Sequence, residues 1–392
     1  MTFRSIPLIA LSSVLFALSS ASRSYCTPPP TDPDQDFKLL LQKIAAEPPD
    51  PCDPPNGPDD KASEIEFHLF ERAASFVVQE LNADPGGARP PHHRATGALK
   101  KLERLSAEID SAWPEENRFH FQVLDLTPAL VVKMTIRTHD SFFVFGIPEE
   151  SPGKPNRLWQ EVGSDGDFAG EGWFGNQLDL YPLHRGPSGN ARFLVVFNNS
   201  GCAGNAIGIA YEAREWDPKS GSGYSGAIIK QEGSLGLSTT PGVHAPTPKD
   251  PFAPIGELKT EGPLLTLPYC WFSAIDTWDN PSMCAVDTYD LSGDNVRFRS
   301  RAYNRPDLVP IAKAIEYAQQ RDFPAVLAYC ASGGVARRLV RDIPPDAHAD
   351  DLRVTRTANG MERIELVGLS TTYRFDVEKR AGRWLVVAFS EE

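Results

Sequence analysis

The chain has 392 residues, of which 41% are hydrophobic and 23% are charged, and its formal net charge is −13. This length and composition are ordinary for a globular protein of two or three domains with a core of normal size. The negative charge argues against nucleic acid as a partner and against adhesion to anionic lipid, because both require a basic surface.

Residues 1–21 have the pattern of a cleavable secretory signal peptide. Arg4 supplies the positive start, an apolar run extends from Ile6 to Leu18, and a small-residue stretch that ends at Ala21 precedes the expected cleavage point. No later apolar run reaches the about 20 residues needed to cross a bilayer. We therefore expect a secreted or periplasmic protein whose mature chain is soluble and has no membrane span.

The six cysteines are expected to form disulfides, because thiols rarely remain free after export. Many pairings are compatible with six cysteines. Two pairings are favoured because they are local, and the third joins the two cysteines that remain: Cys26 with Cys52, Cys270 with Cys284, and Cys202 with Cys330. Free buried thiols are the alternative. The sequence contains no CxxC motif and no Cys/His cluster, so structural zinc is not expected.

Residues 22–60 are predicted to form an extended arm rich in proline and aspartate. Apolar residues at helical spacing predict one short helix within it, over residues 37–44, and Asp36 is placed to cap that helix. A bridge between Cys26 and Cys52 would close a loop around this helix.

Residues 61–113 are predicted to form a helical hairpin. Apolar residues recur at three- and four-residue steps over about 60–81 and again over 95–111, so each helix has one apolar face. The intervening segment 84–91 is rich in proline and glycine, which separates the two helices.

Residues 117–303 are expected to form an all-β region, because short apolar runs alternate with clusters of Gly, Pro, Asn and Asp. The expected strands cover 119–123, 129–136, 141–145, 158–162, 192–197, 207–214, 227–232, 264–271, 284–289 and 296–302. A sandwich is favoured because no repeat of about 40–50 residues is visible. A partial propeller is the alternative.

Residues 306–392 are expected to form an α+β region, since helices come first and antiparallel strands follow. The expected helices cover 307–320, 323–330 and 335–340, and the expected strands cover 352–357, 363–367, 372–378 and 383–389. Asp307 is placed to cap the first helix. The fold class is therefore multidomain, with an N-terminal helical hairpin, a central all-β region and a C-terminal α+β region.

The C-terminal region resembles the nuclear-transport-factor-2-like (NTF2-like) family. The resemblance rests on the first helix, on the segment 321–327 after it, and on the closing hairpin of 373–378 and 382–387. It implies a curved sheet that forms a cone with the helices and often holds a small apolar ligand. This region has no strand pair between its second and third helices, and no Asp/His pair of the family's enzymes falls at a matching position.

Two acidic clusters are candidate calcium sites, because calcium takes about six to eight oxygen ligands from loops of this kind. The clusters are Asp165, Asp167 and Glu171 in one loop, and Asp287, Asp290 and Asp294 further along the chain. Neither matches the spacing of an EF-hand, and aspartate is also a common turn residue. Calcium is the one cofactor hypothesis that the sequence supports.

No catalytic motif is recognisable. Neither Ser222 nor Ser225 has the flanking glycines of a nucleophile elbow. Aromatic side chains in or near loops of the β region suit a protein or carbohydrate partner. They are Trp159, Trp173, Phe174, Trp216, Trp271 and Trp278. We therefore expect an exported, non-catalytic binding protein, and the alternative is an exported hydrolase whose site is assembled from residues distant in sequence.

Overall fold

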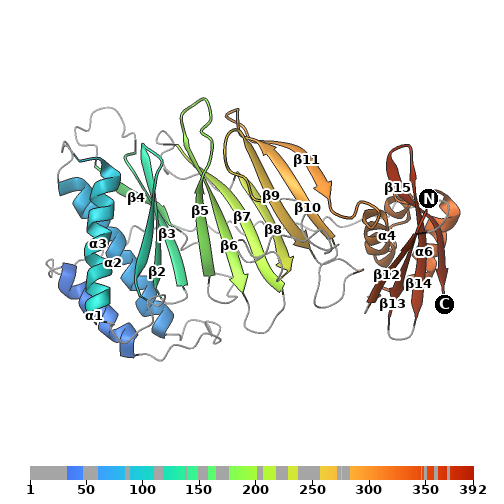
Figure 1. Cartoon of the computed structure of the whole chain (residues 1–392), viewed down its shortest axis with the longest axis horizontal. Coiled ribbons are helices and arrows are strands. Elements are labelled where there is room, and N and C mark those ends of the chain that lie inside the picture. The colour runs from blue at the N-terminus through green and yellow to red at the C-terminus, as the bar shows by residue number, and fades with distance from the viewer. Residues whose placement is uncertain are drawn as a thin grey trace, which may run out of the picture.

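The computed structural model describes the larger part of the chain (Figure 1). The described residues are 33–46, 61–83, 89–109, 118–136, 139–148, 158–164, 176–200, 206–217, 228–236, 257–271, 275, 283–345, 347, 351–356, 361–368 and 371–392. The predicted signal peptide, 1–21, lies outside them. Among the described helices, none combines the length and the apolar composition needed to span a bilayer.

Three helices come first, and all three contribute to one core. They are α1 (Pro33–Ala46), α2 (Lys61–Ala83) and α3 (Pro91–Ile109). The short helix predicted within the arm is longer than expected, and its apolar residues Phe37, Leu41 and Ile44 are buried against the others. Asp36 lies inside α1 rather than at its cap, and its carboxylate is 3.9 Å from the guanidinium of Arg72 on α2.

The first sheet has four antiparallel strands in the order β1-β2-β3-β4. They are β1 (His120–Asp125), β2 (Ala129–Ile136), β3 (His139–Gly146) and β4 (Gln160–Ser164). Side chains alternate between the two faces of a strand. On β2, Leu130, Val132 and Met134 join the core of the helices, while Ala129 and Val131 face the other way. The helices and this sheet thus share one core, and the helical hairpin has no separate core of its own.

The second sheet is a seven-stranded antiparallel meander in the order β11-β10-β9-β8-β7-β6-β5. Its strands are β5 (Asn176–Pro182), β6 (Ala191–Ser200), β7 (Ala206–Trp216), β8 (Ile229–Gly236), β9 (Leu264–Trp271), β10 (Met283–Asp290) and β11 (Arg297–Tyr303). The sequence-based prediction found six of these and missed β5. Only Leu178 and Leu180 on β5 show the apolar alternation, so the signal there is short.

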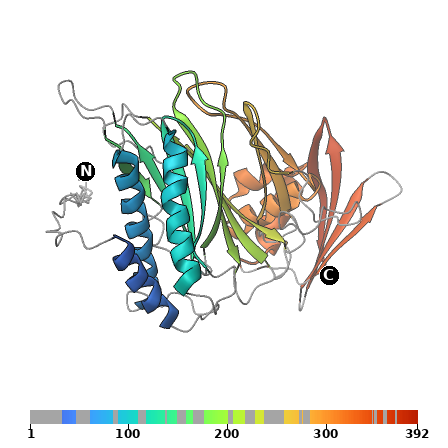
Figure 2. The ribbon, with the colours of Figure 1, turned by 60° about the vertical axis from the view of Figure 1, so that its left-hand side comes forward.

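The two sheets pack against each other, which is the packing expected of a sandwich. Val131 and Phe142 of the first sheet share a core with Phe193, Val195 and Trp216 of the second. Figures 1 and 2 show the resulting layers, with the helices on one side of the first sheet and the seven-stranded sheet on the other. A seven-stranded meander does not match the four-stranded blades of a propeller.

Polar groups set the alignment of the two sheets. Asp140 on β3 accepts a hydrogen bond from the backbone N–H of Leu178 on β5 at 2.7 Å. The same carboxylate pairs with Lys133 on β2 at 2.8 Å, and Lys133 also donates to the carbonyl of Leu178. Because both partners of this ion pair bond to one residue of β5, the first sheet is held at a defined position along the second.

The second sheet is strongly curled, and Arg192 on β6 shows this directly. Its side chain is fully buried and donates to the carbonyls of Leu291 and Gly293, each at 2.9 Å, and of Asp294 at 2.6 Å. Three strands separate β6 from β10 in the sheet. In a flat sheet these strands would lie roughly 19 Å apart. The sheet must therefore curl so that β6 reaches the turn after β10.

The C-terminal part places three helices on one face of a four-stranded antiparallel sheet (Figure 1). The helices are α4 (Val309–Gln319), α5 (Phe323–Leu327) and α6 (Gly333–Asp342). The strands are β12 (Asp351–Arg356), β13 (Glu362–Val367), β14 (Thr372–Arg380) and β15 (Arg383–Glu391). This order of helices and strands is the one predicted from the sequence. The helices cover an apolar face that includes Ile364, Phe375 and Val386.

Two details of this part refine the predictions. Asp307 does not cap α4, because its carboxylate is paired with Arg305, and Leu308 occupies the cap position without a side-chain bond. The hairpin between β14 and β15 closes through Ala381 and Gly382, whose φ angles are 47° and 83°. Positive φ at both central residues defines a type I′ turn, which favours glycine and matches the twist of the flanking strands.

The predicted disulfide between Cys270 and Cys284 is confirmed. The two residues lie directly opposite each other on β9 and β10, with their Cα atoms 3.9 Å apart, and both are buried. The bond joins neighbouring strands at the end of the curled sheet that lies nearest the C-terminal part. Met283, next to Cys284, belongs to the core of the C-terminal part.

Removing this disulfide should lower the free energy of unfolding by about 3 kcal/mol, because it closes a loop of roughly 15 residues in the unfolded chain. Replacing Cys270 and Cys284 together by alanine tests this in urea unfolding. Added reductant should lower the stability of the wild type by more than it lowers that of the double variant. Equal sensitivity of both proteins to reductant would contradict the expectation.

Replacing Arg192 by methionine should cost about 3–5 kcal/mol of stability, because Glu215 and three carbonyls would lose a buried charged partner. Arg380, an arginine 53% exposed at the β14–β15 hairpin, provides the matched control. Arg380→Met should change stability by no more than about 0.5 kcal/mol. Urea unfolding of the two variants measures the difference, and similar losses would show that Arg192 is not required for the curl.

Candidate functional site

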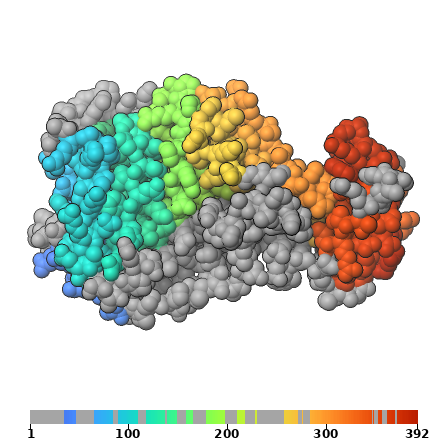
Figure 3. Space-filling view, viewed as in Figure 1, coloured from blue at the N-terminus to red at the C-terminus, as the bar shows by residue number. Residues whose placement is uncertain are grey.

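Strand β11 lies at one edge of the seven-stranded sheet. Among the strands of this sheet whose burial is described at every residue, β11 is the most exposed. We use the name β11 surface for its residues Arg297, Phe298, Arg299 and Arg301. Phe298 is 55% exposed, and the side chain of Arg299 is 58% exposed. Figure 3 shows the yellow-to-orange strands of this end of the sheet open to one side, next to the red C-terminal part.

A bulge sets the direction of the side chains on β11. The register between β10 and β11 shifts between Thr288 and Tyr289, so that Tyr289 lies opposite Phe298 while Asp287 lies opposite Arg301. Bulges are common where a strand must redirect its side chains. The rings of Tyr289 and Phe298 meet edge to face with centroids 5.6 Å apart. The bulge thereby brings an exposed aromatic ring and an arginine to the same face of the strand.

Asp287 holds Arg301 in a fixed orientation. The carboxylate is fully buried and accepts two hydrogen bonds from Arg301, from Nε at 2.7 Å and from one Nη at 2.8 Å. The Tyr269 hydroxyl donates to the same carboxylate at 3.2 Å, and the guanidinium lies over the Tyr269 ring. Such two-point pairing restrains a guanidinium more firmly than a single bond does. The second Nη group of Arg301 is not used in this pair.

The charges of this cluster are stable over the physiological range. Burial and the neighbouring Asp287 carboxylate raise the pKa of Tyr269 and of Tyr289, so both phenols stay neutral. The hydrogen bonds to Asp287 raise the pKa of Arg301 above its ordinary value. The arginine therefore presents a permanent positive charge above a buried carboxylate.

Arg299 is oriented in the same way, by Asp290. Its Nε and one Nη donate to the same carboxylate oxygen of Asp290, and the carboxylate also accepts the backbone N–H of Ser292 in the turn after β10. These bonds hold the pKa of Asp290 well below its ordinary value. Arg297 lies opposite Asp290 in the register and is exposed. The surface thus presents guanidinium groups, while their carboxylate partners lie beneath.

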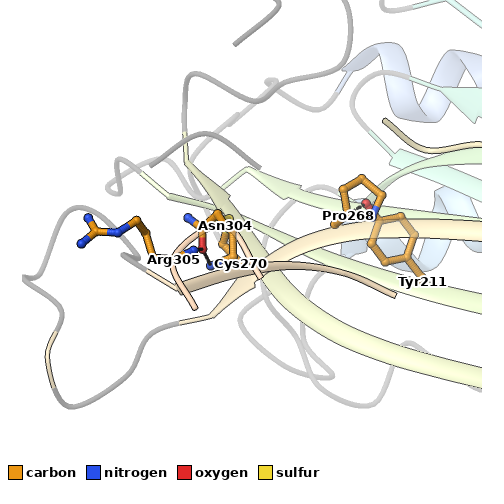
Figure 4. The surroundings of a disulfide bond; sticks show 6 residues. Tyr211, Pro268, Cys270, Asn304 and Arg305 are labelled. Carbon is orange, nitrogen blue, oxygen red and sulfur yellow. Dashed lines mark hydrogen bonds between the residues drawn. A yellow bond between two sulfur atoms is a disulfide. The ribbon is translucent and has the colours of Figure 1, made fainter. Parts of the chain in front are cut away.

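The end of β11 is fixed beside the disulfide, as Figure 4 shows. The side-chain oxygen of Asn304 accepts the backbone N–H of Cys284 at 3.0 Å and that of Arg305 at 2.8 Å. Further into the sheet, the Tyr211 hydroxyl on β7 donates to the carbonyl of Pro268 on β9 at 2.6 Å. The Asn304 bonds thus tie the end of β11 to β10 where the chain leaves the sheet.

The aspartates of one predicted calcium cluster are paired with other groups. Asp287 pairs with Arg301 and Asp290 with Arg299, while Asp294 accepts the backbone N–H of Ser188 at 2.9 Å. Within the described residues no group of three His, Cys, Asp or Glu side chains is placed to hold a metal ion. The other predicted cluster, Asp165, Asp167 and Glu171, lies outside the described residues.

Of the aromatic residues singled out in the sequence, the two whose burial the structure describes are buried. Trp159 is buried in the core of the helices, and Trp216 is buried between the two sheets. Trp271 lies at the end of β9. The remaining three, Trp173, Phe174 and Trp278, lie outside the described residues. The sequence analysis did not single out Phe298. Arginines alternate with other residues from Arg297 to Arg301 in an otherwise acidic chain, and this pattern indicates an exposed basic strand.

The remaining cysteines offer no nucleophile in the part of the chain that the structure describes. Cys330 is a free, buried thiol, so its predicted disulfide with Cys202 is wrong, and the sequence offered only elimination for that pairing. Burial raises the pKa of the Cys330 thiol to about 12. A neutral buried thiol is a poor nucleophile. Cys202, Cys26 and Cys52 lie outside the described residues.

Several histidines are paired with carboxylates. His92 on α3 lies 2.7 Å from Asp125 on β1, and His139 on β3 lies 2.6 Å from the buried carboxylate of Glu66 on α2. His120 on β1 lies 3.6 Å from Glu103 on α3. All three pairs connect the helices to the first sheet, which indicates a role in holding these layers together.

No protein-family model, no curated protein and no solved structure matches this chain.

Cys330 should resist maleimide in the folded protein at about pH 8, since its thiol is buried and neutral. It should react fully in denaturant without reductant, because it is not in a disulfide. Mass mapping of the labelled peptides measures both states, and Ser300→Cys on exposed β11 is the control that should react when folded. A Cys330 that stays unlabelled in denaturant would instead indicate a disulfide.

Proposed function

We propose that this chain is an exported, non-catalytic binding protein that holds a protein partner on its β11 surface. The observation that carries the proposal is the exposed Phe298 beside the oriented Arg301 and Arg299. Aromatic and arginine side chains contribute most of the binding energy at protein interfaces, particularly when they are already held in place. A protein partner is favoured over a carbohydrate for this reason.

Two observations support an oxidising compartment outside the cytosol. The first 21 residues have the signal-peptide pattern, and the disulfide between Cys270 and Cys284 joins two strands of the core. Such disulfides persist mainly in secreted or periplasmic proteins.

The domain layout that we propose follows the shared cores. Residues 33–303 would contain the helices and both sheets, and 306–392 would form a separate α+β unit that supports the end of β11. The order of three helices and four strands in this unit supports its resemblance to the NTF2-like family. Within the described residues no strand pair lies between α5 and α6, as the sequence predicted.

The alternative of an exported hydrolase has less support. Acyl-transfer sites need a serine or cysteine beside a histidine. In the described part of the chain, the free thiol of Cys330 is buried, and the histidine pairs noted above involve carboxylates.

Photo-crosslinking from position 298 tests the proposed function. A benzoylphenylalanine in place of Phe298, in the full chain, should form covalent adducts with a protein from the fraction that the source cells export. Phe67 on α2 is the matched control, because it is an exposed phenylalanine (48%) remote from β11. Adducts from position 67 should be absent.

The adduct from position 298 should be suppressed by excess unlabelled wild-type protein and not by excess Phe298→Asp variant. Equal labelling from positions 298 and 67, or competition by the variant, would show that the β11 surface is not a specific binding site.

A further inference from the structure

Within the described residues, the outer edge of β11 has no strand paired to it. Only one side of β11 pairs with β10, because β11 stands at the end of the sheet order. In the described part of the chain no strand covers the other side, and every residue of β11 before Tyr303 is exposed. An edge of this kind has backbone N–H and C=O groups free to pair with another extended segment.

Arginine is the main charged residue that this edge presents. The side chains of Arg299 and Arg301 are 58% and 37% exposed, whereas those of their partners Asp290 and Asp287 are 13% and 0% exposed. Each guanidinium uses Nε and one Nη for its aspartate. Because the side chain of Arg301 also bonds to Tyr303, the more exposed Arg299 is the guanidinium better placed to meet an incoming acceptor. Arg297 adds a third guanidinium at the start of the strand.

We propose that β11 binds an acidic segment of a partner protein, which adds to the sheet as a further strand. This inference rests on the proposed function and names its partner class. Main-chain hydrogen bonds along β11 provide affinity, and alternating side chains of the partner provide specificity. Carboxylates on the added strand accept hydrogen bonds from the guanidinium groups of Arg299 and Arg297. An apolar residue of the partner packs on Phe298.

The charge of β11 disfavours a second copy of this chain as the occupant. Two β11 strands paired edge to edge would place arginines of one copy beside arginines of the other. Like charges on neighbouring strands destabilise a sheet. An acidic segment has the opposite effect, because each carboxylate meets a guanidinium that is already oriented by Asp287 or Asp290.

Synthetic peptides test the proposal on the full chain by fluorescence polarisation. A peptide that alternates glutamate and valine should bind, and its affinity should fall as salt is raised, because exposed charges are screened. A peptide that alternates lysine and valine should bind far more weakly. The glutamate peptide with a central proline keeps its charge but lacks a backbone donor, and it should also bind weakly.

Variants locate the site. Arg299→Gln and Arg297→Gln should each weaken binding of the glutamate peptide about tenfold, the loss typical of one charged hydrogen bond. Arg380→Gln removes the same charge from a similarly exposed residue of the β14–β15 hairpin and should leave the affinity unchanged. Circular dichroism of each variant confirms that it is folded.

Three results would overturn the proposal. One is no binding of the glutamate peptide, as expected if the arginines serve only to prevent edge association. Another is equal binding of the proline peptide, which excludes strand addition. The third is equal weakening by Arg380→Gln. If crosslinking from position 298 succeeds while the peptides fail, the acidic-strand inference is wrong and the proposed function stands.

Discussion

Arg192 lies fully buried inside the curled sheet, where it bonds to Glu215 on β7 and to three carbonyls in the turn after β10. The curl brings β6 to that turn across three intervening strands. The space around the guanidinium is fully used, since a Cβ at Gly186 would lie 2.8 Å from it. A buried charge is tolerated only when its donors are satisfied. The curl and the burial of Arg192 therefore depend on each other, and together they enclose the apolar face of Leu194, Tyr211 and Leu267.

The curl also explains where the candidate site lies. The turn held by Arg192 contains Ser292, which anchors Asp290, and Asp290 in turn orients Arg299. At the other end of β10 and β11, Asn304 and the Cys270–Cys284 disulfide fix the exit of the strand toward the C-terminal part. β11 is thus held at both ends, while no described strand pairs with its outer edge. A rigid strand with an exposed edge loses little conformational freedom when another segment binds.

Local patterns predicted most elements, and the differences have physical causes. The segments 129–136 and 264–271 were predicted with their observed ends, because apolar residues run through them and turn residues flank them. β5 was missed because only Leu178 and Leu180 carry its pattern. The helix around Phe37 was assigned to an arm, since its buried face is visible only once α2 and α3 are in place. The sequence places Trp216 in or near a loop, and the structure has it at the end of β7, enclosed by the core between the sheets.

The sequence by itself determined the kinds of elements, their order and one disulfide, because helix and strand periodicity and turn residues act over a few neighbours. Only the tertiary structure decided that the helices and first sheet share a core, that the second sheet curls around Arg192, and that Cys330 stays free. It also decided what two of the aspartates contact. The sequence suggested Asp287 and Asp290 as calcium ligands, and in the structure their carboxylates orient Arg301 and Arg299. The role of a carboxylate depends on the cation that lies beside it, and here the pairing register of β10 and β11 decides which arginine that is.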